Sequence, residues 1–561
     1  MNRQWWKEAV VYEIYCKSFC DSNGDGIGDI KGVISKLPVL KELGIDCIWF
    51  TPLYKSPQAD NGYDVADYED IDSDYGTMDD FKELLDKAHS MGIRVIMDMV
   101  LNHTSDEHKW FVESKKSKDN PYRNYYIWQP PKADGIEPNN WGNRFREGNG
   151  SAWEFDETTG EYYLHQYSKK MPDLNWEYEP LRKDVYAMLN RWLDMGIDGF
   201  RLDIITRLKK PSGFPDTTHP RDPKLDINGY ILDPDMCTIV DGIHEILHEL
   251  YTEVFYREDC MTVGEASGVN SKNALEFVDE KRQELDMVYY PELSARKRKR
   301  FDAARFREVQ SNWAKVLEKG GWAVQVLSNH DRPRQVSKYG DDGKFRKESS
   351  KLLAVLMHTT PGTPFMYQGE EIGMTNVRYD SIDDYNCPYA RGDYFALVKN
   401  GVSEKEAMDI MAPLSRDNAR TPVQWNDKEN AGFTTGKPWI KVNSNYKEIN
   451  FEADRKSDDS IFAFYQQLLR MRKEHLVMVY GDLKFYLEDD DKIIMYTRKY
   501  ENEEMLVIAN YSGEEAAFTM PEALSCQKWT RLLANTERKP LLEEGRMLLA
   551  PWECEVYVKA K

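Results

Sequence analysis

Short apolar runs alternate with amphipathic stretches along most of the chain. The amphipathic stretches 30–43, 78–92 and 181–196 have helical periodicity. Eight apolar runs have the length of buried strands, at residues 10–15, 45–50, 94–100, 199–205, 261–265, 285–290, 322–331 and 363–371. Strands that alternate with helices pair in parallel through right-handed crossovers. The pattern therefore predicts an α/β fold of the (β/α)8, or TIM barrel, type.

Two intervals break this rhythm. Residues 104–173 are rich in Trp, Tyr, Asn and Gly and lack a helical repeat, so we expect an inserted subdomain after the third strand. Beyond residue 481, apolar and polar positions alternate, which is typical of antiparallel strands. We expect a barrel formed by 1–103 and 174–480, the insert 104–173, and a C-terminal antiparallel β-sandwich at 481–561.

Composition narrows the function classes. The net charge of -21 disfavours nucleic acid and anionic lipid as partners, so we expect a small neutral substrate. The sequence has no apolar run long enough to span a membrane and no recognisable signal peptide. Its 8 cysteines are scattered without a CxxC pair, which indicates a reducing cytoplasm. We expect a monomer or a weak homo-oligomer without an organic cofactor.

Charged residues gather where the expected strands end. The carboxyl ends of all barrel strands meet at one mouth, so these side chains should converge there. They are Asp98, Arg201, Asp203, Glu265, His330 and Asp331. Several carboxylates with one arginine suit glycoside cleavage, which needs a nucleophile and a separate acid/base, about 5–5.5 Å apart in retaining enzymes.

The spacing of Arg201 and Asp203 also suggests how Asp203 and Glu265 could differ in protonation. Arg201 and Asp203 lie two residues apart, so both side chains share one face of a strand, and the guanidinium should keep Asp203 ionised. Glu265 must instead carry a proton at rest in order to donate it. Neighbouring carboxylates favour that protonated form.

Four short motifs carry a family resemblance. "DMVLNH" (98–103), "GFRLD" (199–203), "TVGEA" (262–266) and "LSNHD" (327–331) resemble the motifs of the α-amylase superfamily, glycoside hydrolase family thirteen. They occur in that family's order and at expected strand ends. "GIDCIWFTPLYKSP" (44–57) and "DLNW" (173–176) resemble its auxiliary motifs, so the likeness covers essentially the whole chain.

The resemblance implies residue roles. Asp203 would be the nucleophile, Glu265 the general acid/base, and Asp331 the group that grips sugar hydroxyls and stabilises the transition state. "LSRDNARTPVQW" (414–425) resembles the stretch that closes the glucose pocket in the oligo-1,6-glucosidase branch, which implies exo-action. The implied substrate-binding residues are Asp60, Tyr63, Asp98, His103, Phe145, Tyr167, Arg201, Ile204, His330, Arg416 and Arg420.

The stretch "DSNGDGIGD" after the first expected strand resembles a calcium loop. An EF-hand would need a glutamate at the twelfth position, where this sequence has Gly32, and a helix where a strand is expected. The family resemblance implies a structural divalent cation instead. Its ligands would be the side chains of Asp21, Asn23, Asp25 and Asp29 and the carbonyl of Ile27. Oxygen ligands favour calcium, with magnesium as the alternative.

The residue after the expected nucleophile bears on linkage. Ile204 is stiff and β-branched, like the valine that accompanies α-1,6 specificity in this branch, so we expect isomaltose-type bonds to be preferred over maltose. Met171 and the basic run Arg296–Arg300 depart from the branch pattern. The alternatives are a sucrose isomerase or transglucosidase, a trehalose-6-phosphate hydrolase, and a non-catalytic barrel of a transporter heavy chain, which would need a membrane anchor.

Overall fold

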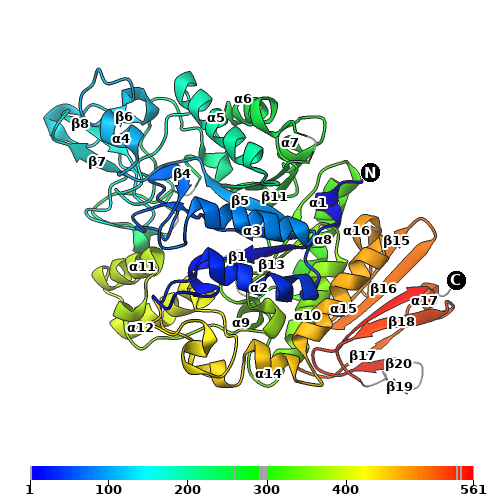
Figure 1. The fold of residues 1–561 in the computed structure, drawn as a ribbon. Helices are drawn as coiled ribbons and strands as arrows, with labels where there is room; N and C mark the ends of the chain where they lie inside the picture. The colour runs from blue at the N-terminus through cyan, green and yellow to red at the C-terminus, as the bar shows by residue number, and fades with distance from the viewer. Residues whose placement is uncertain are drawn as a thin grey trace.

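A parallel β-barrel forms the centre of the molecule (Figure 1). The computed structural model describes residues 3–220, 222–233, 235–257, 259–289, 292–293, 300–537, 541–543 and 546–559. In this part of the chain the sheet order is β11-β10-β9-β5-β2-β1-β13-β12, and a parallel bridge from Val288 to Ala323 joins the two end strands. The strands are β1 (Val11–Ile14), β2 (Cys47–Phe50), β5 (Arg94–Val100), β9 (Gly199–Asp203), β10 (Met261–Glu265), β11 (Met287–Tyr289), β12 (Val324–Gln325) and β13 (Thr363–Tyr367). Each expected strand is present, and the barrel prediction is confirmed.

Amphipathic helices cover the outside of the barrel. The expected helix at 30–43 is α2 (Ile30–Leu43), which begins at the Asp29 cap and ends at Gly44 in a left-handed conformation. The other long helices are α3 (Met78–Ser90), α5 (Glu179–Met195), α6 (Ile243–Leu250), α8 (Ala303–Glu318), α10 (Arg346–Thr359), α11 (Pro388–Lys399), α12 (Glu404–Met411) and α15 (Ile461–Glu474). Shorter helices are α1 (Trp5–Glu8), α4 (Lys109–Ser114), α7 (Leu275–Val278), α9 (Gln335–Tyr339), α13 (Asp417–Arg420), α14 (Phe451–Arg455), α16 (Val477–Tyr480) and α17 (Glu522–Ser525).

The expected insert after the third barrel strand contains a small antiparallel sheet in the order β6-β8-β7. Its strands are β6 (Trp128–Gln129), β7 (Trp153–Asp156) and β8 (Glu161–Leu164), and a hairpin of β3 (Tyr54–Lys55) and β4 (Asp67–Ile71) precedes it in the chain. A separate apolar cluster that includes Trp141, Trp153 and Leu164 forms its core. Figure 1 shows the insert at the end of the molecule opposite the C-terminal sheets.

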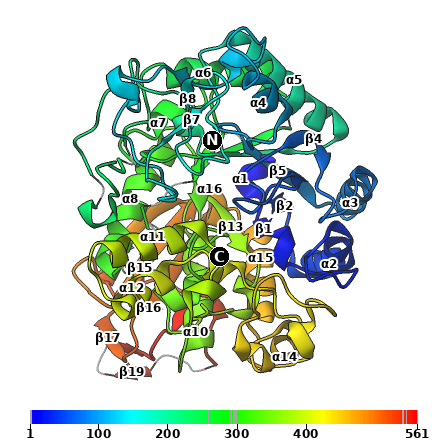
Figure 2. The same ribbon diagram turned by 90° about the vertical axis from the view of Figure 1, so that its left-hand side faces the viewer.

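The chain ends in antiparallel sheets, as expected (Figure 2). One sheet has the order β14-β15-β16-β21-β18, with β14 (Asp482–Tyr486), β15 (Ile493–Tyr500), β16 (Glu503–Asn510), β18 (Trp529–Ala534) and β21 (Cys554–Lys559). The other has the order β17-β20-β19, with β17 (Ala516–Thr519), β19 (Leu541–Glu543) and β20 (Arg546–Leu549). Apolar side chains of both sheets share one core. The exact domain boundaries remain predictions.

The basic run singled out in the sequence lies mostly outside the described residues, which resume at Arg300. The Arg300 guanidinium donates a hydrogen bond of 3.1 Å to the carbonyl of Tyr511. It also lies 4.3 Å from the ring centroid of Tyr511 and 4.2 Å from that of Trp552. Arg300 therefore packs against the C-terminal region of the chain.

Candidate active site

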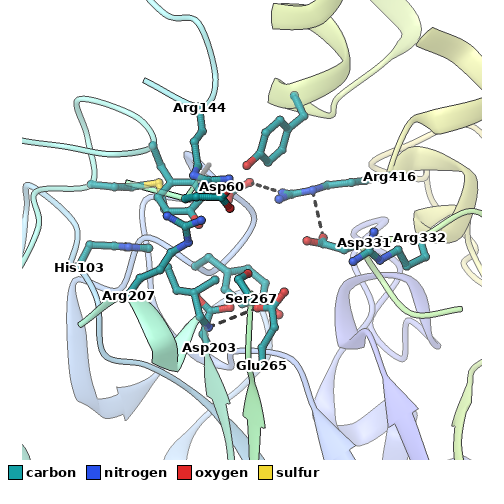
Figure 3. A pocket seen from close by; sticks show the side chains of 16 residues that line it. Asp60, His103, Arg144, Asp203, Arg207, Glu265, Ser267, Asp331, Arg332 and Arg416 are labelled. Atoms are coloured by element: carbon teal, nitrogen blue, oxygen red, sulfur yellow. Dashed lines mark hydrogen bonds and ion pairs between the residues drawn. The ribbon is translucent and has the colours of Figure 1, made fainter. Parts of the chain in front are cut away.

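A cavity of about 340 Å³ opens at the carboxyl ends of the barrel strands (Figure 3). The side chains that line it come from the barrel loops, the insert and the segment after β13. Predicted site residues among them are Asp60, Tyr63, His103, Tyr167, Asp203, Ile204, Glu265, Asp331 and Arg416. The cavity is also lined by Arg144, Met171, Arg207, Asp235, Ser267, Arg332 and Tyr389.

One guanidinium holds three carboxylates together. Arg201 Nη1 donates to Asp203 Oδ1 at 2.7 Å and to Asp98 Oδ1 at 2.9 Å, and Arg201 Nη2 donates to Glu265 Oε2 at 2.8 Å. The sheet order explains this, because β9 carries Arg201 and Asp203 and lies between β5 with Asp98 and β10 with Glu265. Asp203 and Glu265 therefore face the same cavity from neighbouring strands.

Burial and shared charge set the protonation of this cluster. Burial raises the pKa of Asp203, and the neighbouring charges of Glu265 and Asp98 raise it further, while Arg201 lowers it. Burial likewise raises the pKa of Asp98 to about 6 against the lowering effect of Arg201. Arg201 thus acts in the expected direction, but burial outweighs it in the free protein. Because the groups interact strongly, they titrate as a unit.

The residue after Asp203 has an unusual backbone. Ile204 lies in the left-handed region with φ 37° and ψ 39°, which is rare for a β-branched residue. Its amide donates to Glu265 Oε2 at 3.3 Å, and its side chain lines the cavity. Strained backbone of this kind persists where the surroundings impose it, often at functional sites. The turn therefore places the Ile204 side chain in the cavity wall, while the Ile204 amide contacts the Glu265 carboxylate.

Ion pairs close one side of the cavity. Arg416 Nη1 lies 3.1 Å from Asp60 Oδ1, and Arg416 Nε lies 3.1 Å from Asp331 Oδ1. Arg420 Nη2 donates to the same Asp331 oxygen at 2.8 Å. Burial raises the pKa of Asp331, but Arg416, His330 and Arg420 lower it much more, so this carboxylate stays ionised.

An imidazole on the opposite side of the cavity, where Arg207 also lies, offers a hydrogen to a ligand (Figure 3). Asn102 Nδ2 lies 3.1 Å from His103 Nδ1, which makes Nδ1 the acceptor. Burial lowers the pKa of His103 to about 4, so the neutral ring carries its hydrogen on Nε2. His103 Nε2 is buried and has no hydrogen-bond partner among the described residues. A ligand hydroxyl in the cavity would supply the missing acceptor.

Five predicted residues do not line the cavity themselves. Asp98, Arg201 and His330 hold lining groups from behind, and Arg420 holds Asp331. The ring of Phe145 packs edge-on against the lining rings of Tyr167 and Tyr389, with centroids 5.7 and 4.9 Å apart. The structure thus brings every predicted catalytic and substrate-binding residue either into the cavity wall or directly behind it.

Sequence reasoning missed several lining residues. Arg332 directly follows Asp331, and Arg207 follows Ile204 by three positions, so strand-end proximity could have indicated both. Arg144 lies in the insert and Tyr389 in α11, where no motif points to the cavity. Met171, which was noted as a departure from the branch pattern, is fully buried and lines the cavity.

The loop Asp21–Asp29 lies apart from the cavity-lining side chains and folds around its own side chains. Asp21 accepts hydrogen bonds from the amides of Asn23, Gly24 and Gly26 and from the hydroxyl of Thr434. Burial raises the pKa of Asp21, but these hydrogen bonds outweigh burial and lower it below the usual value. The loop therefore presents ionised oxygen to its centre.

The other loop side chains cap backbone amides, although Asn23 and Asp25 are exposed. Asn23 Oδ1 accepts from the amide of Asp25, and Asp25 Oδ1 accepts from the amide of Ile27. Asp29 caps α2 through the amide of Gly32 and also accepts from Ser22. Among the described residues, no three His, Cys, Asp or Glu side chains converge as metal ligands would, so the cation at this loop stays a prediction.

Comparison with known proteins agrees with this geometry. Residues 13–481 match the family model of the α-amylase catalytic domain, and residues 483–555 match that of the maltogenic amylase C-terminal domain. The chain belongs to the α-amylase family. This family resemblance, drawn first from four motifs, is therefore confirmed.

Relatives within the α-amylase family have several printed activities. An oligo-1,6-glucosidase of Parageobacillus thermoglucosidasius is 48% identical, over 99% of both chains. A trehalose-6-phosphate hydrolase of Bacillus subtilis is 43% identical, over 99% of this chain and 98% of the relative. The crystal structure of an isomaltulose synthase from Protaminobacter rubrum superposes with a TM-score of 0.92 at 40% identity, covering all of both chains.

Two whole-chain features complete the description of this α-amylase family member. Among the described residues, no helix has both the length and the apolar character needed to cross a bilayer. All the cysteines lie in the described part of the chain as free thiols, and only Cys526 of them is exposed.

Proposed function

We propose that the protein is a retaining, exo-acting α-glucosidase that releases glucose from the non-reducing end of short α-glucosides and prefers α-1,6 linkages. The observation that carries the proposal is the shared guanidinium of Arg201, which binds Asp203 at 2.7 Å and Glu265 at 2.8 Å. Two carboxyl groups held by one guanidinium at the same cavity are the pair that a double displacement needs.

The chemistry divides between these carboxyl groups. Asp203 attacks the anomeric carbon and forms a glycosyl ester, while Glu265 donates its proton to the departing glycosidic oxygen. Glu265 then takes a proton from water, and that water cleaves the ester and restores Asp203. The positive charge of Arg201 favours the ionised form of Asp203. The ionised Asp203 then stabilises the positive charge that develops on the sugar in the transition state.

The closed side of the cavity supports exo-action. The ion pairs of Arg416 with Asp60 and Asp331 leave no room for a further sugar on that side of the cavity. The glucose bound there must therefore be the non-reducing end of the substrate. Asp331 would accept hydrogen bonds from hydroxyls of this glucose, and His103 Nε2 would donate one to a hydroxyl of the substrate. Ile204 lies beside the scissile bond and would crowd the path of an α-1,4-linked neighbour. The oligo-1,6-glucosidase names of several full-length relatives support the linkage.

A second candidate is hydrolysis of a phosphorylated disaccharide. It is favoured by the arginines Arg144, Arg207 and Arg332 in the cavity wall and by the trehalose-6-phosphate hydrolase relative. For the loop Asp21–Asp29 we propose a structural calcium ion, with magnesium as the alternative, supported by its oxygen-rich donor set. The free thiols favour a reducing compartment such as the cytoplasm.

One experiment tests the main proposal. Isomaltose, maltose, sucrose, panose and trehalose 6-phosphate are incubated separately with the protein, and every product is identified. Isomaltose and panose should yield glucose of retained α configuration faster than maltose does. Asp203→Asn should abolish turnover of every substrate while the circular dichroism spectrum stays unchanged. Near-normal rates in Asp203→Asn would show that another group is the nucleophile.

A further inference from the structure

Two arginines outside the family motifs lie in one wall of the cavity. Arg144 comes from the insert, and Arg207 comes from the short turn Ile205–Arg207 after the strand that carries Asp203. Figure 3 shows their guanidinium groups approaching each other from opposite sides. Both residues are buried, with relative exposures of 9% and 3%. Buried arginine is uncommon unless an interaction requires it.

Gln166 contacts both arginines, Arg144 through its backbone and Arg207 through its side chain. The carbonyl of Gln166 accepts from the Arg144 amide at 2.8 Å, and Gln166 Oε1 accepts from Arg207 Nη1 at 3.3 Å. Gln166 in turn donates to Asp173, whose carboxylate lies 3.1 Å from Lys210 Nζ. The amide of Gln166 thus stands between Arg207 and the nearby carboxylate of Asp173.

The two guanidinium groups repel one another. Burial lowers the pKa of Arg207, and the charge of Arg144 lowers it further. Burial lowers the pKa of Arg144, but Tyr167 and Tyr389, whose phenol hydrogen-bonds Arg144, outweigh burial and raise the pKa above its usual value. An anion between the two arginines would relieve this repulsion. The attraction between the anion and the arginines is stronger in a buried site of low dielectric constant than in water.

Arg144 and Arg207 lie on the side of the cavity that the aglycone, the leaving part of the substrate, would occupy. In Figure 3, Arg416 and Asp331 lie on one side of the cavity and Arg144 and Arg207 on the other, with Asp203 and Glu265 below and between them. A glucose held against Arg416 and Asp331 would direct its leaving group across the carboxylates toward the arginines. Asp235 also lines this cavity but is exposed, so solvent screens its charge.

We propose that Arg144 and Arg207 together bind an anionic group, a phosphate ester or a carboxylate, on the aglycone of an α-glucoside. The proposal rests on the α-glucosidase function proposed above and specifies its substrate class. Planar guanidinium groups bind phosphate and carboxylate oxygens through paired, charge-assisted hydrogen bonds. Two of them on one wall select an anionic aglycone over a neutral one.

Matched substrates test this subsite. Trehalose 6-phosphate is compared with trehalose, and isomaltobionate with isomaltitol, so that each pair differs in the charge of the aglycone. For the phosphate pair, the carboxylate pair or both, the wild-type protein should show a kcat/KM at least about tenfold higher for the anionic member, as one charge-assisted hydrogen bond provides. The pair that shows the preference identifies the anion, and no preference in either pair would overturn the proposal.

Variants then assign the preference to the arginines. Arg144→Gln and Arg207→Gln should each lower the anionic-to-neutral ratio of kcat/KM by about tenfold, mainly through KM, whereas Arg→Lys at either position should retain part of it. Arg378→Gln, at an exposed arginine paired with Asp409, is the control and should keep the wild-type ratio. An unchanged ratio in both Gln variants would refute the assignment.

A measurement on the wild-type protein covers variants that fail to fold. Inorganic phosphate should competitively inhibit hydrolysis of 4-nitrophenyl α-glucoside more strongly than chloride at equal ionic strength; equal inhibition by the two salts would count against the site. If the wild-type protein cleaves neither 4-nitrophenyl α-glucoside nor any disaccharide, the α-glucosidase function itself is wrong. Cleavage without anion preference leaves that function intact and refutes only the subsite.

Discussion

Glu13 Oε1 lies 2.6 Å from His330 Nδ1 and also accepts the His330 amide at 3.2 Å. On the other side of the ring, His330 Nε2 lies 2.7 Å from the hydroxyl of Tyr63, which donates to Asp98 at 2.9 Å. Asp98 binds Arg201, the residue that holds Asp203. A hydrogen-bonded chain therefore runs from Glu13 on the first barrel strand to the proposed nucleophile on the fourth.

The protonation of Glu13 leads to a first prediction. Burial raises the pKa of Glu13 well above its ordinary value, which favours the neutral form of the side chain. Glu13→Gln, which is neutral and of the same shape, should keep kcat/KM within about threefold, whereas Glu13→Leu should lose at least about tenfold by leaving a buried partner unsatisfied. Steady-state kinetics with circular dichroism checks both. Equal losses in the two variants would mean that Glu13 acts as an anion.

The pH dependence of the reaction gives a second prediction. The nucleophile must be ionised, and the pKa values of Asp203 and Asp98 are raised, the latter to about 6. Activity should therefore be full above the raised pKa of Asp203 and fall as pH decreases through it, so the acidic limb of kcat/KM should lie above the ordinary value of an aspartate. An isolated aspartate would place it near 4. An acidic limb at the ordinary value would show that Arg201 outweighs burial after all.

Linkage preference depends on the side chain after the nucleophile. Ile204→Ala removes the bulk beside Glu265 and should lower the isomaltose-to-maltose ratio of kcat/KM by about tenfold, the range expected for a change of a few methylenes in a pocket. Ile204→Val keeps the β-branch and is the matched control, with a ratio near that of the wild type. Product analysis on both disaccharides provides the ratio. A ratio that stays constant in Ile204→Ala would place the linkage determinant elsewhere.

Cation binding to the loop Asp21–Asp29 should appear as thermal stabilisation. A ligand at about 100 times its Kd stabilises the folded state by about 2.7 kcal/mol. Excess Ca²⁺ should therefore raise the Tm of chelator-treated protein by at least a degree, and Asp25→Asn should weaken the effect. Asp458→Asn, at an exposed aspartate outside the loop, should respond like the wild type. Identical melting curves with and without Ca²⁺ would argue that the loop is held by its hydrogen bonds alone.

The barrel could be predicted from the sequence because the same pattern, an apolar strand followed by an amphipathic helix, recurs along the chain. The barrel strands are apolar runs buried on both faces, and helices such as α3 and α5 have one buried apolar face, so local pattern and global fold agree. Asp98, Asp203 and Glu265 could be placed together because parallel strands of a barrel end at one mouth. The C-terminal sheets could also be predicted, because apolar and polar residues alternate there with a period of two.

Other parts of the site had no local signal. Arg144, Tyr389 and Gln166 meet only through the path of the insert and α11, and no periodicity encodes that path. The protonation of Asp203 was misjudged because the sequence shows its cationic neighbour but not how deeply both are buried. The backbone strain at Ile204 likewise depends on contacts with other strands and is invisible in the residue type.

The loop after the first strand is fastened to a segment near the end of the barrel. Thr434 hydrogen-bonds Asp21 across 413 positions of sequence, and the amide of Trp439 donates to the carbonyl of Gly26. A side chain at Gly26 would come within 1.9 Å of the carbonyl of Lys437, so the two segments meet backbone to backbone. During synthesis on the ribosome, the first βα turn must wait for this late stretch to emerge before it can reach its final form. Nascent chains truncated before this stretch should therefore expose the loop to protease, and chains extended past it should protect the loop.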